Sequence, residues 1–218
     1  MIQIKNVDVY GWEAAIRGMR NPMNSWNKSD SEYIAPRGNS RLPIAYIIGE
    51  NDLKLMKSLA KAGSDHRKYL RMINVTIDIN APLYWWKEFD TYKVGTVANS
   101  CSTMHKIAEK EFTLDDFSHE HLTIECRNLL EKIIVCLNAK RDLYNCGKEK
   151  HDWWQMIQLL PSSYNQLRTV QLNYEVLYNI YNARKNHKLD EWHILCDSIL
   201  QLPYFKEIFD IGELNAEN

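Results

Sequence analysis

Residues 73–79 read Ile-Asn-Val-Thr-Ile-Asp-Ile, an unbroken alternation of apolar and polar side chains. Because successive side chains of a β-strand point to opposite faces of a sheet, this pattern predicts a strand with one apolar and one polar face. The strand lies within residues 63–105, which mix cationic with aromatic side chains and include a run of small polar residues at 96–103. Cations suit phosphates, and hydroxyls and amides suit ring edges, so this segment favours an anionic, ring-bearing ligand.

Long helices are predicted on the C-terminal side of this strand. Apolar residues recur at helical spacing over residues 121–144 and 189–200, which is typical of amphipathic helices. The pattern Ser163-x-x-Gln166 is typical of a capping box and predicts another long helix that ends near Lys185. Shorter helices are expected over residues 12–19, 52–62 and 83–92.

Two further strands and a loop complete the outline. Residues 1–9 alternate apolar and polar side chains, and residues 42–49 form a compact apolar run, so both are predicted to be strands. Residues 21–40 are rich in Asn, Ser, Pro and Gly and are expected to form a loop. The sequence therefore predicts an α+β fold, a small central sheet flanked by long helices, with residues 1–218 as a single domain.

Composition argues against several classes of function. The net charge is −1, which opposes binding to nucleic acid polymers, and no apolar run approaches the roughly 20 residues that cross a membrane. The five cysteines form no Cys-x-x-Cys pair, a usage typical of a reducing cytoplasm. The His and Cys spacings match no zinc site, so we expect no bound metal. The sequence also has no glycine-rich phosphate loop, and it has no nucleophile elbow of the kind that a Ser-His-Asp hydrolase needs.

Two pairs of residues leave alternatives open. Arg17 and Arg20 lie three residues apart and would share a helix face, either as solvated surface arginines or as a phosphate clamp. Asn173 and Arg184 lie eleven residues apart on the predicted long helix, about three turns and about 16 Å along its axis. Their shared face would either line an elongated site or face solvent.

This constellation resembles the flavin-dependent thymidylate synthases. In that family a Glu-His pair leads into a strand, and about two dozen residues later comes the motif Arg-His-Arg-x-x-Ser-x-Asn-Glu-x-Ser-x-Arg-Tyr. A late helix carries Asn-x-Arg and, eleven residues after that Asn, an Arg that holds the nucleotide phosphate. Here Asp65-His66 takes the place of Glu-His, residues 92–105 fall on the motif, and Asn173 and Arg184 fall on the late helix.

The motif itself is degenerate in this chain. Of its fixed positions only Asn99 and Ser102 are retained. Lys93 replaces a His, Ser100 replaces the Glu, and Met104 replaces the Arg at the second-to-last position of the motif. The match depends on spacing more than on identity, and it runs from about residue 53 to residue 209. It implies the family's fold, with a mostly antiparallel sheet, more directly than the family's reaction.

Roles are implied residue by residue where the positions correspond. Those implied to contact the flavin are His66, Lys93, Asn99 and Asn173. Those implied to contact the nucleotide are Ser100, Ser102 and Arg184. Catalytic roles fall on Ser102, beside the pyrimidine, and on His105, which can donate or accept a proton near neutral pH.

The function implied is a flavin-dependent methylation or hydroxymethylation of a pyrimidine nucleotide, resembling thymidylate synthesis from dUMP. The implied cofactors are FAD, methylene-tetrahydrofolate and NADPH, and the partners are a small-molecule nucleotide and further copies of the chain in a homotetramer, with neither a membrane nor a nucleic acid polymer. Two alternatives remain: a non-catalytic or substrate-altered relative that binds nucleotide and FAD, and a helical assembly protein whose Trp and Tyr residues make subunit contacts.

Overall fold

The computed structural model describes residues 1–34 and 45–212. The chain forms two compact units. The first unit comprises Met1–Asn6, Ile77–Lys93 and Val97–Val170, and the second comprises Val7–Thr76, Val94–Thr96 and Gln171–Asn218. The boundaries fall inside three strands, β1 (Gln3–Tyr10), β4 (Asn74–Pro82) and β6 (Asn165–Asn173).

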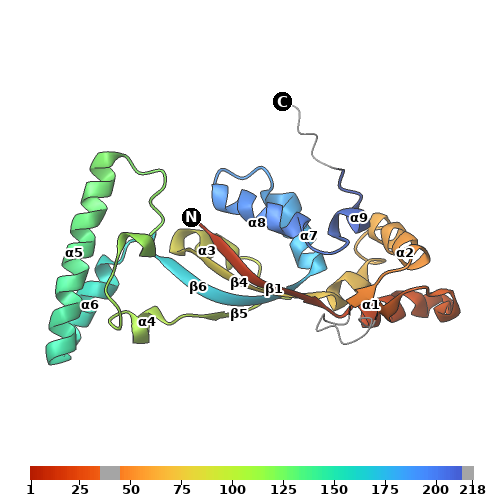
Figure 1. Ribbon diagram of the computed structural model, residues 1–218, viewed down its shortest axis with the longest axis horizontal. Helices are drawn as coiled ribbons and strands as arrows, with labels where there is room; N and C mark the ends of the chain where they lie inside the picture. The colour runs from red at the N-terminus through yellow and green to blue at the C-terminus, as the bar shows by residue number, and fades with distance from the viewer. Residues whose placement is uncertain (35–44, 213–218) are drawn as a thin grey trace. The chain divides into compact units, whose positions relative to one another are not determined.

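These three strands and β5 (Val97–Ser100) form a sheet of order β1-β4-β6-β5, which places β5 at an edge (Figure 1). A second, two-stranded antiparallel sheet joins β2 (Glu32–Ile34) to β3 (Ala45–Ile47), with Tyr33 opposite Tyr46. The helices are α1 (Trp12–Arg20), α2 (Glu50–Lys61), α3 (Leu83–Phe89), α4 (Thr103–Lys106), α5 (Ile124–Gly147), α6 (Lys150–Leu159), α7 (Tyr174–Arg184), α8 (Asp190–Leu200) and α9 (Phe205–Phe209). A small antiparallel sheet with long helices confirms the predicted α+β class.

The alternating stretch behaves as its pattern predicts. In β4 the apolar residues Val75, Ile77 and Ile79 are buried, whereas Thr76 and Asp78 between them are half-buried. Asp78 accepts hydrogen bonds from Asn6 and Thr169 on its two neighbouring strands, at 2.7 and 2.6 Å. Thr169 and Asn6 together hold the pKa of the Asp78 carboxyl below its usual value.

The first unit has its core under the long helix α5. Leu130, Ile134 and Leu137 of α5 are buried in a cluster that also holds Phe117 and Met156. Figure 1 shows α6 lying alongside α5. The sequence predicted α5 from its apolar spacing and missed α6, whose ten residues include the adjacent Trp153 and Trp154.

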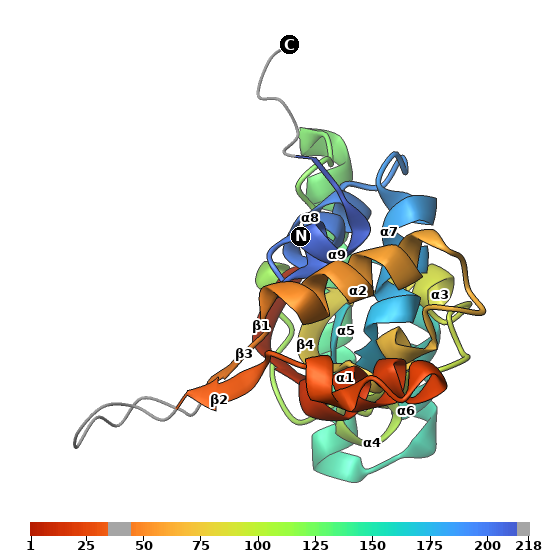
Figure 2. The same ribbon diagram turned by 90° about the vertical axis from the view of Figure 1, so that its right-hand side faces the viewer.

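The second unit packs α1, α2, α7, α8 and α9 around aromatic side chains. Tyr174 of α7 stacks on Phe205 of α9 at a centroid distance of 5.3 Å, and Tyr178 stacks on Phe209 at 3.9 Å. In Figure 2, α1 and α2 face the viewer, with β2 and β3 extending away at their side. These contacts tie the C-terminal helices to one another within the unit.

Arg20 matches neither of the two interpretations offered for it. Its side chain is only 4% exposed, and its Nε donates to Asp52, which is fully buried, at 2.6 Å. Arg20 also donates to the main-chain carbonyls of Ser25 and Lys28. Arg17, by contrast, is exposed and lies 3.6 Å from Glu13. Arg20 therefore has a structural role, whereas Arg17 remains at the surface.

Two predicted segments differ from the structure. The helix expected from Ser163 does not form, because residues 165–173 are strand β6 and the helix α7 begins only at Tyr174. The expected loop at 21–40 contains two short 3-10 helices, at Asn21–Met23 and Trp26–Lys28, and strand β2. Residues 35–40 of that loop and residues 42–44 of the predicted strand at 42–49 lie outside the described residues.

Candidate functional site

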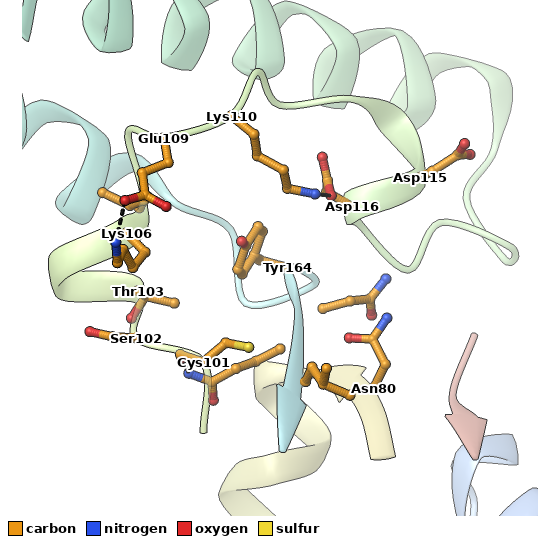
Figure 3. A pocket seen from close by; sticks show the side chains of 14 residues that line it. Asn80, Cys101, Ser102, Thr103, Lys106, Glu109, Lys110, Asp115, Asp116 and Tyr164 are labelled. Atoms are coloured by element: carbon orange, nitrogen blue, oxygen red, sulfur yellow. Dashed lines mark hydrogen bonds and ion pairs between the residues drawn. The ribbon is translucent and has the colours of Figure 1, made fainter. Parts of the chain in front are cut away.

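A cavity of about 380 Å³ lies in the first unit, beside the segment that joins β5 to α4 (Figure 3). It is bounded by this segment, by the short 3-10 helix Leu114–Asp116 and by the beginning of β6. Its polar lining residues include amides and hydroxyls: Asn80, Ser102, Thr103, Tyr164, Asn165 and Gln166. The thiol-bearing Cys101, which is exposed, also lines it.

The charged residues of this cavity are largely paired with one another. Lys106 forms an ion pair with Glu109, and Lys110 forms one with Asp116 (Figure 3). Its hydrogen bond to Asp116 raises the pKa of Lys110. With Asp115, the lining holds two lysines against three carboxylates, so its formal charge is negative. The cavity therefore suits uncharged polar groups such as a ring edge, and it does not offer a phosphate an unpaired cation.

Four of the predicted site residues lie along the β5–α4 segment. Asn99 and Ser100 are exposed on the edge strand β5. Ser102 lines the cavity and caps α4, since its Oγ accepts a hydrogen bond from the main-chain N–H of His105 at 3.1 Å. His105 itself is exposed. The structure thus places Ser102 in the cavity wall, with the other three close by in sequence but not among the lining residues.

Lys93, also predicted to contact the flavin, is exposed just after α3 in the first unit. The three remaining predicted residues belong to the second unit. His66 is exposed in the turn before the 3-10 helix Lys68–Met72. Asn173 is 9% exposed and caps α7 by accepting from the N–H of Val176 at 3.1 Å.

Arg184 ends α7, with its guanidinium 4.6 Å from the ring of Trp192 in α8. Since α7 has eleven residues, its cap and its last residue are separated by about 16 Å. The expectation that Asn173 lies within the helix was wrong. Asn173 precedes the first turn of α7, and its amide oxygen caps the helix.

Several residues at these sites were missed by the sequence reasoning. Arg67, next to His66, makes a forked contact with Glu175 of α7, with Nε 2.9 Å from Oε2 and Nη2 3.0 Å from Oε1. Its guanidinium also lies 5.0 Å from the ring of Tyr178. Asn80 continues the polar face of β4, and the alternation of that strand could have indicated it. Gln166 falls in the capping-box pattern, which predicts the start of a helix and not a cavity wall.

Gly95 is held against the start of α7, and its replacement by alanine is expected to destabilise the second unit. Its φ is +75°, and an added Cβ would lie 3.1 Å from Nδ2 of Asn173 and 3.3 Å from Cγ2 of Val176. Gly63 is a matched control, since its φ is +103° but nothing lies within 4 Å of its added Cβ. Gly63→Ala should cost about 1 kcal/mol for the left-handed backbone alone, and Gly95→Ala about 2 kcal/mol or more. Equal losses in urea unfolding would show that the contact with the helix cap is immaterial.

Within residues 1–34 and 45–212, no group of three or more His, Cys, Asp or Glu side chains is arranged to hold a metal ion. In the same residues, no helix has both the length and the apolarity to span a membrane.

Comparison with known proteins gives a likeness of fold. Neither a scan against protein-family models nor a search of curated proteins found a match. Among solved structures, the chain is similar to thymidylate synthase X from Helicobacter pylori solved with FAD and dUMP, at 14% identity and a TM-score of 0.64, over 96% of this chain and 97% of that chain. A second structure, the flavin-dependent thymidylate synthase of the same organism complexed with FAD and dUMP, gives 15% identity and a TM-score of 0.64 over 94% and 97%. The likeness covers nearly the whole of both chains and shows that they share a fold.

Proposed function

We propose that this protein binds a flavin and a pyrimidine nucleotide and methylates or hydroxymethylates the pyrimidine, with FAD, methylene-tetrahydrofolate and NADPH as the cofactors. The observation that carries the proposal is the fold, which matches proteins solved with FAD and dUMP over at least 94% of this chain. Fold alone does not determine chemistry. The residues at the corresponding positions must therefore be tested for their fit to these ligands.

The cavity beside α4 fits part of such a ligand. Amides and hydroxyls there suit the edge of a pyrimidine or flavin ring, and Ser102 in the cavity wall would contact that ring. Asn99 and Ser100, exposed on β5 outside the lining, would contact parts of the ligand that extend beyond the cavity. The negative lining does not fit a diphosphate. The phosphates would instead be held outside the cavity, by the cations Lys93 and Arg184 and by the ring N–H of His66. A bound flavin would supply the redox chemistry, and the chain would orient the rings and neutralise the phosphates.

Cations in different parts of the chain can bind one ligand if several copies of the chain contribute residues to each site. We therefore propose that the protein is a homotetramer. Large apolar side chains on α5 support association, since Leu129, Val135 and Leu143 are 60%, 70% and 52% exposed. Apolar side chains left exposed in one copy of the chain could be covered by another copy. Light scattering on the purified chain is expected to give the mass of four copies, and a monomer that persists at micromolar concentration would remove this part of the proposal.

The reaction is tested by turnover. Purified protein is incubated with FAD, dUMP, methylene-tetrahydrofolate and NADPH, and the nucleotides are analysed by mass spectrometry for a methylated or hydroxymethylated product. Omitting methylene-tetrahydrofolate is the control, since it removes the source of the carbon. Product that forms only in the complete mixture supports the enzyme.

A non-catalytic relative is the second candidate, and the motif favours it at two positions. Ser100 stands where the family has a carboxylate, and Met104 stands where it has an arginine. Loss of a charge-assisted hydrogen bond typically costs about 1.5–3 kcal/mol. This candidate predicts a rise in melting temperature on adding FAD or dUMP without any product. A third candidate, an assembly protein, predicts neither a rise in melting temperature with FAD or dUMP nor any product.

A further inference from the structure

Gln166 of β6 is buried behind the β5–α4 segment, and both ends of its side-chain amide are bonded. Gln166 as a whole is 8% exposed. Its Nε2 donates to the main-chain carbonyl of Cys101 at 2.8 Å, and its Oε1 accepts from Nε of Arg168 at 2.9 Å. Its main-chain carbonyl accepts from the indole N–H of Trp86 at 2.9 Å. Held by one hydrogen bond at its nitrogen and one at its oxygen, the Gln166 amide has a fixed orientation within the cavity wall.

Arg168 determines which way the amide of Gln166 faces. Its Nη1 donates to Asp90 at 2.8 Å, and its guanidinium lies 4.2 Å from the ring of Trp86. A guanidinium has donors only, so the atom of Gln166 that meets it must be the amide oxygen. The amide nitrogen is therefore directed at Cys101, where it meets a carbonyl oxygen.

Cys101 is held by β6 through both of its main-chain polar groups. Its N–H donates to the carbonyl of Leu167 at 2.9 Å, and its carbonyl accepts from Gln166. Because the peptide group is planar, fixing the Cys101 carbonyl also fixes the orientation of the following peptide N–H, that of Ser102. Ser100 and Ser102, two of the three residues proposed to contact the nucleotide, flank this fixed point.

We propose that Gln166 is a positioning residue for the nucleotide site: by holding the Cys101 carbonyl it sets the orientation of the segment from Ser100 to Ser102. The role in ligand binding rests on the proposed function. The role in holding the segment stands on the contacts alone, and the two parts can be measured separately.

The test is Gln166→Glu, which changes one polar group and keeps the shape. The carboxylate still accepts from Arg168, but it has no proton to donate and sets an oxygen against the Cys101 carbonyl. Amide hydrogen exchange in residues 100–105 is expected to accelerate about tenfold or more, and the dissociation constant for dUMP is expected to rise by a similar factor, since the Cys101 carbonyl loses its donor and meets a carboxylate oxygen instead. Exchange is followed by mass spectrometry and dUMP binding by calorimetry.

Asn165→Asp is the matched control. Asn165 lines the same cavity, and its Oδ1 accepts from Ser118 at 2.9 Å, a bond that an aspartate keeps. The variant adds the same negative charge to the cavity without touching Cys101, so any effect of charge alone on dUMP appears in both variants. Its exchange in residues 100–105 is expected to match that of the wild type. If Gln166→Glu does not fold, Arg168→Met removes the donor to the Gln166 oxygen and is expected to give the same two changes.

Two results would overturn a part of this assignment, and a third would contradict the proposed function. Unchanged exchange in residues 100–105 in the folded variant shows that Gln166 does not hold the segment. Faster exchange with unchanged dUMP affinity shows that the segment does not position the nucleotide. A wild-type protein that binds no dUMP contradicts the proposed function instead, and the exchange measurement then decides alone whether Gln166 orients the segment.

Discussion

Replacing Asp52 by alanine is expected to destabilise the second unit by about 3–5 kcal/mol, because the change leaves the buried Arg20 without its counterion. Asp52 is fully buried and also accepts from the hydroxyls of Ser29 and Ser31, at 2.7 and 2.6 Å, and from the main-chain N–H of Asp30 at 3.1 Å. One carboxylate thus fixes the end of α1 and the segment that follows it. The free energy of unfolding is measured in urea by circular dichroism.

Lys61→Ala is the control for this prediction. Lys61 also forms an ion pair, with Asp210 at 2.8 Å, but both side chains are more than 60% exposed. Exposed pairs contribute at most about 1 kcal/mol, so this variant should be nearly as stable as the wild type. Equal losses in the two variants would contradict the account of Asp52 as the fixed point of this region.

The Asp52 carboxylate is also expected to make the free energy of unfolding depend on pH. Burial raises the pKa of Asp52, but hydrogen bonds from Ser31, Ser29 and Arg20 outweigh it and hold the pKa below the ordinary 3.8. Since the folded-state pKa is depressed, the stabilisation is present above the unfolded value and is lost as the pH falls through the folded one. The stability gap between wild type and Asp52→Ala should therefore narrow below about pH 4, and a gap that is constant down to pH 2 would contradict it.

Arg184→Ala is expected to weaken the binding of dUMP roughly ten- to hundredfold, the loss typical of a charge-assisted hydrogen bond to phosphate. Arg184 is half-buried at the end of α7 and lies over Trp192. An arginine can fork two donors toward a phosphate, which a lysine cannot. Calorimetric titration of dUMP into the purified variant measures the change.

Lys185→Ala is the matched control, since Lys185 follows Arg184 at the same helix end and its Nζ also lies over an aromatic ring, that of Tyr181, at 5.4 Å. It removes one positive charge from the same neighbourhood. If both variants lose affinity equally, the effect is a diffuse one of charge. If neither loses affinity, Arg184 is a structural arginine that complements the helix end and Trp192.

The strands and helices with a strong periodic signal were predictable. The alternation in β4 and the apolar spacing of α5 each depend on a single local period. In β4 the buried residues fall where that period places them, whereas in α5 Leu130, Ile134 and Leu137 are buried but Leu129 of the predicted apolar face is exposed. The β6 strand was not predictable in the same way. Ser163 and Gln166 have the spacing of a capping box, but pairing in the sheet, which brings together residues distant in sequence, overrides that local preference.

The candidate site was predictable only in part, for a related reason. Ser102, one of the two motif positions that this chain retains, lines the cavity, and its role in a site stays a prediction. The residues that support it, Gln166 and Arg168, gain their importance from contacts with Cys101 and Trp86, which lie 65 and 82 residues away in the chain. No local pattern encodes such contacts. The charge of the cavity also depends on which lysine meets which carboxylate, and this pairing appears only in the folded chain.

The central claim, that this fold still binds a flavin and a pyrimidine nucleotide, is tested most directly by titrating FAD into the purified protein with and without dUMP. The flavin absorbance and fluorescence are followed together. We expect saturable binding at micromolar FAD, with a further spectral change when dUMP is added. Flavin that stays spectrally free at millimolar protein, whether or not dUMP is present, would contradict the claim.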